Sequence, residues 1–269
     1  MRHFLLLPAV LAILALAALG CSRNEAEEQA GISAYEAPRL HYKDIPGITP
    51  QEIAEIDALR AEYSKFVYAV MPGGEAFADG RGGLGGFSAK VCELLTYMFD
   101  IPFEPRVYEW ADLLEAMQRG EAQFTGELSA TGERRRQYLM TGPIYERTVK
   151  IFTSAHDAPL VEGLVIDRNL RWAFLEDDVT EAGVRAATLT PFDVVYVRDY
   201  AQAAELLRTG EIDAFFASSS AVAWFEDYDF IVDHDFLPLI RMPISISTAN
   251  PKLSPIISAL RKYLEKKKK

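Results

Sequence analysis

Hydrophobic and polar positions along this chain repeat one arrangement twice. Residues 113–119 have apolar positions at helical spacing, a Gly-Glu pair follows at 120–121, residues 122–128 alternate as in a short strand, and Ser129 comes next. Residues 206–221 show the same order, with a helical segment, Gly210 and Glu211, an apolar strand, and serines at 218–220. Each half therefore reads as a helix-to-strand unit of an open α/β sheet.

This repetition predicts two α/β lobes around one cleft. Ligands of open α/β sheets bind beyond the carboxyl ends of the strands, so the two serine-bearing loops should face each other. We expect lobe one at residues 66–148, lobe two at 149–241, and a return to lobe one followed by a basic tail at 242–269. Residues 149–154 and 242–247 are then the two crossing strands of a hinge. A helix at 49–65 should precede lobe one, because Thr49, Pro50 and Glu52 form a capping box with proline at the first helical position.

The loop after the first repeated strand carries candidate anion-binding chemistry. Ser129 and Thr131 have side chains that cap helices, and Arg134 stands at the helix start that follows. Free N–H groups of a helix N-terminus and a guanidinium beside them suit a carboxylate. Arg135 and Arg136 are interpreted as part of a solvated helix face.

Five short motifs in and around this loop resemble those of bacterial extracellular solute-binding proteins of family 3. Residues 131–134 are similar to the T-x-E-R signature, and residues 141–145 are similar to T-x-P-Y. Residues 86–87 match the G-F start of the family's first helix. The remaining two motifs are W-x-x-L-x-x-x-L-x-x-G at residues 110–120 and L-x-x-G-x-I-D-A at residues 206–214. The resemblance implies a two-lobe periplasmic-binding-protein-like fold of type II. It also implies that Arg134 grips a carboxylate of a small polar solute, amino-acid-like or carboxylate-bearing, which an ABC transporter receives.

Other positions depart from the family pattern. Ser218 stands where relatives that bind amino acids have an acid for the ligand's ammonium, and Asp177 and Asp178 replace a hydroxyl-bearing loop. Glu75 lies near the place of a stacking aromatic residue, and Glu127 precedes the serine loop, so a cationic or amine-bearing ligand could find acids there. The structural alternative is that the two aspartates cap a turn and that Glu75 is solvated. Trp110 and Tyr108 are assigned to the core or the cleft wall.

The N-terminus resembles a lipoprotein signal peptide. Residues 1–20 combine a short basic start with an apolar stretch, and Cys21 follows small residues as in a lipobox. An uncleaved membrane anchor is the alternative. We expect cleavage, lipidation of Cys21, a polar tether over residues 21–48, and a place on the periplasmic or extracellular face of the inner or the outer membrane.

Composition excludes several other classes. The chain has 269 residues, 49% of them hydrophobic, and a net charge of −11, which disfavours nucleic-acid binding. The four histidines show no metal-ligand spacing, and Cys92 reads as a buried small hydrophobe. We therefore expect no cofactor, no metal, no disulfide and a monomer.

Three functions remain open at this stage. The first is solute binding for a transporter. The second is ligand sensing for a signalling partner, because residues 42–50 also resemble extracytoplasmic sensing regions of some diguanylate cyclases. The third, less favoured, is a dehydratase-like enzyme on the same fold, with Glu127 or Asp178 as a general acid.

Overall fold

A computed structural model describes residues 40–80, 82–155 and 169–266. The predicted signal peptide, Cys21 and most of the predicted tether lie outside the described residues, as does the end of the basic tail. Among the helices that are described, none combines the length and the hydrophobicity that a membrane span requires. The described part forms one compact unit from Leu40 onward.

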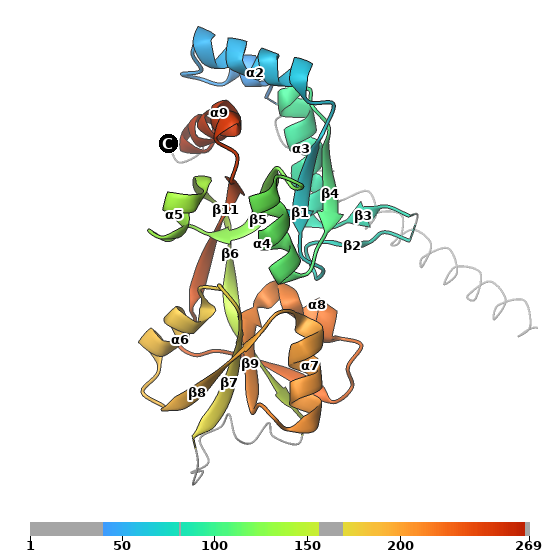
Figure 1. Cartoon of the computed structure of the whole chain (residues 1–269), viewed down its shortest axis with the longest axis vertical. Coiled ribbons are helices and arrows are strands. Elements are labelled where there is room, and N and C mark those ends of the chain that lie inside the picture. Colours follow the sequence, from blue (N-terminus) through green and yellow to red (C-terminus); the bar gives the residue numbers. More distant parts are fainter. Residues whose placement is uncertain (1–39, 81, 156–168, 267–269) are drawn as a thin grey trace, which may run out of the picture. The chain divides into compact units, whose positions relative to one another are not determined.

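The unit contains the two α/β lobes predicted from the repetition (Figure 1). Lobe one has three parallel strands, β1 (Phe66–Val70), β4 (Phe103–Val107) and β5 (Phe124–Ser129). Lobe two has three parallel strands as well, β7 (Leu170–Leu175), β8 (Phe192–Val197) and β9 (Ala214–Ser218). In lobe one β1 lies between β4 and β5, and in lobe two β7 lies between β8 and β9. The first strand of each lobe is thus the central one, which is an arrangement that βαβ units build.

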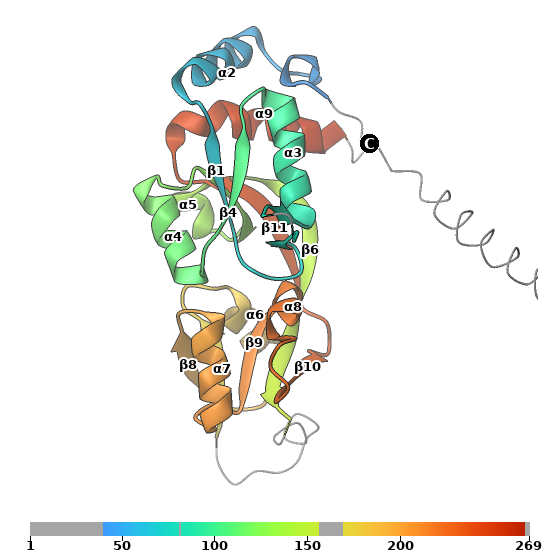
Figure 2. The same cartoon turned by 90° about the vertical axis from the view of Figure 1, so that its right-hand side faces the viewer.

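Two long antiparallel strands belong to both lobes. These are β6 (Leu139–Ser154) and β11 (Arg241–Thr248), and Figure 2 shows both running from one lobe into the other. Strand β11 pairs with β5 in lobe one, whereas the end of β6 pairs in lobe two with β9 and with β10 (Ile231–Asp235). The chain therefore crosses between the lobes twice, once on each strand.

The repeated helices end as the sequence predicts. Helix α4 (Trp110–Arg119) stops at Gly120 and α7 (Tyr200–Thr209) stops at Gly210, with φ values of 73° and 70°. Glycine adopts this left-handed conformation without strain, so it ends each helix and turns the chain into the next strand. As a result, β5 and β9 both end at a serine, Ser129 and Ser218.

The remaining helices cover the sheets. They are α3 (Phe87–Phe99) and α5 (Arg134–Gln137) in lobe one, α6 (Thr180–Ala187) and α8 (Val222–Phe225) in lobe two, and α9 (Ser254–Lys266) at the end of the chain. Short pieces complete the fold: strands β2 (Phe77–Ala78) and β3 (Leu84–Gly85), and the 3-10 turns at Tyr42–Asp44, Ser219–Ala221 and Pro251–Leu253. Helix α9 returns to lobe one, where it contacts β6 and α2.

The predicted capping box is confirmed at the start of α2 (Pro50–Glu62). The Thr49 hydroxyl accepts from the backbone of Glu52, whose carboxylate accepts from the backbone of Thr49. The helix ends three residues earlier than predicted, because the backbone becomes extended at Tyr63.

Residues 40–48 correct the predicted tether. Tyr42 and Ile45 are buried in the lobe-one core, and the Tyr42 hydroxyl donates a hydrogen bond to Asp57 of α2. The Tyr42 ring also stacks near Phe99 of α3. An aromatic side chain that fills a core position removes apolar surface from water, so this segment belongs to the folded unit rather than to a free linker.

Candidate functional site

Arg134 lies at the seam between the lobes. Its backbone N–H donates to the Thr131 hydroxyl over 3.1 Å at the start of the short helix α5. The side chain is 9% exposed; its Nη2 donates to the Asp177 carbonyl of lobe two over 2.8 Å, and its Nη1 donates to the Ser129 carbonyl over 3.4 Å. Burial lowers the pKa of Arg134, and the Asp178 carboxylate at 3.7 Å opposes that change. The guanidinium remains a cation that faces lobe two.

The opposite side of the seam is the loop between β7 and α6. Asp177 has a φ of 57°, a left-handed conformation that aspartate adopts more readily than most residues, and its carbonyl accepts from Arg134. The Asp178 carboxylate accepts a hydrogen bond from the Thr180 hydroxyl at the start of α6. Asp178 thus both holds the helix start and faces the Arg134 guanidinium.

A cavity of about 740 Å³ opens beside Arg134 between these two loops. Its walls come from α4 and the β5–α5 loop on one side and from the β7–α6 loop and β8 on the other. Arg134 is the only basic residue among the described lining residues, whereas five are acidic: Glu133, Glu176, Asp177, Asp178 and Glu181. A cavity with one guanidinium and several carboxylates suits a solute that carries both an anionic and a cationic group.

Glu75 and Glu127 form a separate cluster around Arg147. The Arg147 Nη1 lies 2.7 Å from Glu127, its Nε donates to Glu75 over 3.0 Å, and its Nη2 donates to the second Glu75 oxygen. The Tyr145 hydroxyl also donates to Glu75, over 2.6 Å. Arg147 and Glu127 are buried, with side chains 5% and 3% exposed. Two carboxylates therefore enclose one guanidinium inside the protein.

The pKa values in this cluster follow from burial and from the opposite charges. Burial raises the pKa of Glu127, and the Arg147 charge counteracts that rise. Burial also acts to lower the pKa of Arg147, but Glu127 and Glu75 outweigh it and raise this pKa well above its usual range. Arg147 is thus a permanent cation held by two acids.

Glu75 and Glu127, which the sequence offers as carboxylates for a cationic ligand, are therefore paired within the protein in this structure. Both are already bonded to Arg147, and one Glu127 oxygen also accepts from the Met71 backbone over 3.2 Å. The predicted general-acid role of Glu127 meets the same obstacle. Sequence reasoning missed Arg147, a basic residue in the predicted crossing region, because nothing in the linear pattern connects it to Glu75.

The two serines at the strand ends lie outside the cavity lining. The Ser129 side chain is buried, and its hydroxyl has no hydrogen-bond partner among the described residues. The Ser218 hydroxyl lies 2.7 Å from that of Ser220. Of the predicted ligand contacts, the structure therefore brings Arg134, Thr131 and Asp178 into one cavity and leaves Ser129, Ser218, Glu75 and Glu127 outside its walls.

Several direct contacts join the lobes at the seam. The Trp110 indole N–H donates to the Glu176 carbonyl over 2.5 Å, and the Gly74 N–H donates to the Ser220 carbonyl over 3.0 Å. Trp110 is 2% exposed, and its ring also lies 5.5 Å from the Arg134 guanidinium carbon. Its assignment to the core or the cleft wall is confirmed, and the polar end of its ring adds a bond across the seam.

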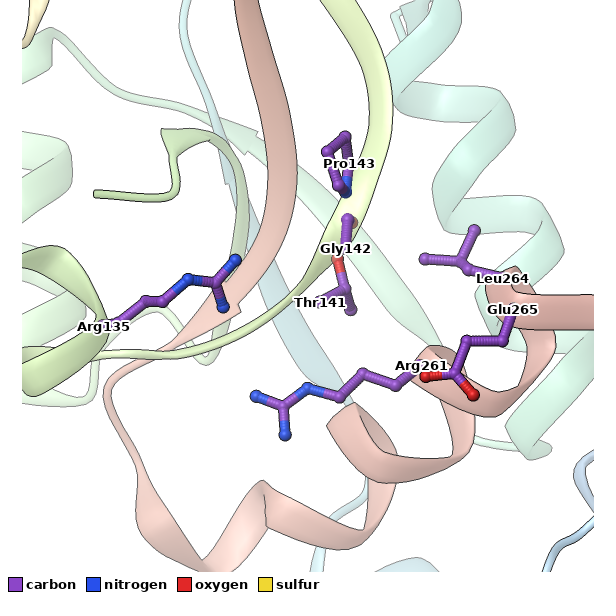
Figure 3. A pocket seen from close by; sticks show the side chains of 7 residues that line it. All are labelled: Arg135, Thr141, Gly142, Pro143, Arg261, Leu264 and Glu265. Atoms are coloured by element: carbon purple, nitrogen blue, oxygen red, sulfur yellow. Dashed lines mark hydrogen bonds between the residues drawn. The ribbon is translucent and has the colours of Figure 1, made fainter. Parts of the chain in front are cut away.

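Arg135 and Arg136 are exposed, as the sequence predicts. Figure 3 shows Arg135 extending from α5 and Arg261 from α9 toward the β6 segment at Thr141, beside a cavity of about 200 Å³. Arg261 donates twice to the Met140 carbonyl, over 2.9 and 2.7 Å, which fastens α9 to β6. Within the described residues, no group of His, Cys, Asp and Glu is arranged to hold a metal ion.

Comparisons with known proteins agree with this geometry. Residues 74–223 match the family described as bacterial extracellular solute-binding proteins, family 3. An amino acid ABC transporter substrate-binding protein from Streptococcus pneumoniae, bound to L-arginine, is similar in structure, with a TM-score of 0.61 and 17% identity over 79% of this chain and 92% of that one.

Two further solved structures are similar at comparable levels. Holo ArgBP from T. maritima has a TM-score of 0.59 and 14% identity, over 79% of this chain and 94% of that one. An ancestral amino-acid-binding protein, a precursor of cyclohexadienyl dehydratase, has a TM-score of 0.58 and 16% identity, over 79% and 93%. The chain matches no curated protein. At these identities the structural matches establish the shared fold.

Proposed function

The chain belongs to family 3 of the bacterial extracellular solute-binding proteins, and we propose that it binds an amino acid or a closely related zwitterion beside Arg134. The observation that carries this proposal is the composition of the 740 Å³ cavity, which is lined by one nearly buried guanidinium and five acidic residues, with Asp178 3.7 Å from the guanidinium. The solute's carboxylate pairs with Arg134, and its ammonium is held by the acids of the lobe-two wall.

The contacts of Arg134 explain how a solute enters this arrangement. In the structure its Nη2 donates to a neutral carbonyl of Asp177, and Nη1 makes only a long contact of 3.4 Å to Ser129. A carboxylate accepts from a guanidinium through two parallel, charge-assisted hydrogen bonds, which are stronger than bonds to carbonyls. A solute carboxylate therefore replaces the carbonyl at Nη2 and stays between the lobes.

The ammonium is held by acids other than those predicted from the sequence. Glu75 and Glu127 are occupied by Arg147, and Ser218 carries no charge. Asp178 lies 3.7 Å from Arg134 and lines the cavity together with Glu176 and Glu181. Glu181 is already paired with Arg185 and accepts from the Tyr196 hydroxyl, so Asp178 and Glu176 are the carboxylates left to receive a cationic group beside Arg134.

Two conclusions about cellular role accompany this proposal. The protein delivers its solute to an ABC transporter, as the similar Streptococcus pneumoniae protein is described to do. It works on the periplasmic or extracellular side, held to a membrane by lipid on Cys21 after removal of residues 1–20.

A melting-temperature screen tests the binding step. A ligand that binds only the folded protein raises its melting temperature, by an amount that grows with the logarithm of the ratio of ligand concentration to dissociation constant. We expect a rise with at least one amino acid, lost in Arg134→Ala and kept in Arg135→Ala, since Arg135 lies on an exposed face. No rise with any amino acid, or an unchanged rise in Arg134→Ala, contradicts the proposed site.

A sensing role is the second candidate. Residues 42–50, which resemble sensing regions of some diguanylate cyclases, are built into the lobe-one core through Tyr42 and Ile45 and do not form a loose linker. In this case a signalling partner reads the solute-bound state. Co-purification with a permease from the native membrane supports transport, and co-purification with a cyclase or a kinase supports sensing.

A further inference from the structure

A second groove, of about 490 Å³, lies at the lobe seam and shares no lining residue with the Arg134 cavity. Its lobe-one wall is the loop that follows β1, and its lobe-two wall is α8 with the turn after it; Figure 1 shows α8 at the edge of lobe two that meets this loop. The lining contains three aromatic rings and one carboxylate, with Pro72 and Phe77 on one side and Trp224, Asp227 and Tyr228 on the other.

The rings on the lobe-two wall are held in place by their neighbours. Trp224 stacks on Tyr228 with ring centroids 5.1 Å apart and an interplanar angle of 18°. The Trp224 ring also meets Tyr200 edge-on at 5.6 Å, and Tyr200 is fully buried. Rings fixed in this way lose little conformational entropy when they contact a ligand.

Phe77 supplies a ring from the lobe-one wall. It sits on the short hairpin of β2 and β3, and it is 51% exposed. A Cβ atom added to Gly85 would lie only 3.0 Å from the Phe77 ring, so the hairpin backbone supports the ring closely. An exposed aromatic residue with such support presents apolar surface that no part of the described chain covers.

The charge around this groove is negative. Asp227 is exposed, and Glu226 and Asp229 beside it are exposed as well. Within the described part of the chain, none of these three carboxylates forms a salt bridge, and the groove lining contains no basic residue. A cation that approaches the groove meets this negative potential before it reaches the rings.

We propose that this groove binds a small quaternary ammonium compound. Aromatic rings attract cations through the negative face of the π system, and a quaternary ammonium makes no hydrogen bond that the groove would have to satisfy. Asp227 supplies the counter-charge at the edge. A primary ammonium should bind less well, because it gives up hydrogen bonds to water that a mostly aromatic wall does not replace.

The position of the groove predicts an effect on the lobes. Its two walls belong to different lobes, and the Gly74 N–H donates to the Ser220 carbonyl over 3.0 Å directly beside it. A ligand that contacts both walls therefore favours the arrangement in which the lobes meet. The groove shares no lining residue with the amino-acid site proposed above, and its proposal does not rest on that site.

Isothermal calorimetry of the full chain with choline chloride tests the proposal. Sodium chloride at equal ionic strength controls for salt, and 3,3-dimethyl-1-butanol, the uncharged carbon analogue of choline, controls for apolar contact. We expect saturable choline binding, at least tenfold weaker binding of the analogue, and roughly fivefold weaker choline binding in Phe77→Leu and in Asp227→Asn.

Two control variants outside the groove and one variant of the amino-acid site distinguish binding in the groove from binding elsewhere on the protein. Tyr97→Leu removes an aromatic ring of similar exposure on α3, and Asp112→Asn removes an exposed acid of α4; both should bind choline as the wild type does. Arg134→Ala should lose the rise in melting temperature that amino acids cause, and it should keep choline binding. The proposal is overturned if choline binds no more tightly than its analogue, if Phe77→Leu and Asp227→Asn leave binding unchanged, or if Arg134→Ala abolishes it.

Discussion

Arg147, in the strand that crosses between the lobes, is bonded to both carboxylate oxygens of Glu75, which lies 72 positions earlier in the chain. The same guanidinium reaches Glu127 at the core of lobe one. Glu75 belongs to the loop whose Gly74 contacts Ser220 of lobe two. The cluster therefore connects the lobe-one core, the crossing strand and a loop that touches the other lobe.

Arg147→Ala should strongly destabilise the protein. It leaves Glu75 and Glu127 near each other without a cation, and breaking a buried ion pair in this way costs about 3–5 kcal/mol of unfolding free energy. Urea unfolding followed by circular dichroism measures this loss. Arg241→Ala is the matched control, because the Arg241–Glu146 pair is exposed and should contribute about 0–1 kcal/mol. Equal losses in the two variants would contradict the central position of Arg147.

Trp110→Phe should increase the population of separated lobes. Phenylalanine keeps most of the packing but cannot donate to the Glu176 carbonyl, and one such bond contributes about 1 kcal/mol, or roughly a fivefold change in a two-state equilibrium. A larger radius of gyration in small-angle X-ray scattering is the expected result. Trp172→Phe, at a position packed within lobe two, should leave the radius unchanged.

Glu52 should make the protein sensitive to acid. Burial disfavours its charged form, but hydrogen bonds from Lys262, Ser258 and Thr49 prevail and lower its pKa to about 2. A carboxyl whose pKa is lower in the folded state contributes stability above its unfolded pKa of about 4.5, and that contribution is lost as the pH falls toward 2.

We expect this loss to be about 2 kcal/mol, since the pair is partly exposed to solvent. Urea unfolding at pH 7, 4 and 3 measures it. In Glu52→Gln the drop between pH 7 and pH 3 should be smaller by about 1 kcal/mol, because the rest of the loss occurs only as the pH falls below 3. An identical pH profile in both proteins would show that the docking of α2 on α9 does not depend on the Glu52 charge.

Cys92 should be inert in the folded protein. Burial raises the pKa of this thiol to about 12, with a smaller contribution from Glu93, so very little thiolate forms at pH 8. In a Cys21→Ser variant, 5,5′-dithiobis(2-nitrobenzoic acid) should react only as fast as the protein unfolds, and at once in 8 M urea. Rapid reaction without denaturant would contradict the burial of Cys92 in α3.

Gly86→Ala should destabilise lobe one. Gly86 precedes α3 with a φ of 96°, and a Cβ there would lie 2.4 Å from the Glu75 carbonyl oxygen. Both the backbone conformation and the close contact oppose alanine, so we expect a loss of about 2 kcal/mol and a melting temperature lower by about 5 °C. Gly132→Ala, where a Cβ meets nothing within 4 Å, is the control and should change stability little.

The local sequence pattern was sufficient to predict much of the fold. The Gly-Glu pairs at 120–121 and 210–211 mark helix ends because glycine alone takes the left-handed cap without strain, and Thr49 with Glu52 marks the start of α2 for a similarly local reason. The spacing of the motifs around Arg134 was sufficient to identify the family. Each of these signals depends on residues only a few positions apart.

Contacts between segments that are far apart in the sequence could be identified only in the tertiary structure. Tyr42 and Ile45 lie in a polar stretch of sequence, and only the α2 and α3 surfaces beside them explain their burial. Glu75, Glu127 and Arg147 are charged residues that composition assigns to the surface, yet Arg147 and Glu127 are buried in lobe one and both acids pair with the Arg147 guanidinium. A linear pattern cannot report which acid meets which base.

By itself the sequence determined the two α/β lobes, the double crossing between them, the family, and Arg134 as the basic residue of the seam, because these follow from local propensity and from motif spacing. Only the tertiary structure decided which carboxylates line the cavity beside Arg134. The physical reason is that a buried charge must be paired: Arg147 pairs with Glu75 and Glu127 in a separate cluster, whereas Asp178 lies at the cavity wall 3.7 Å from Arg134.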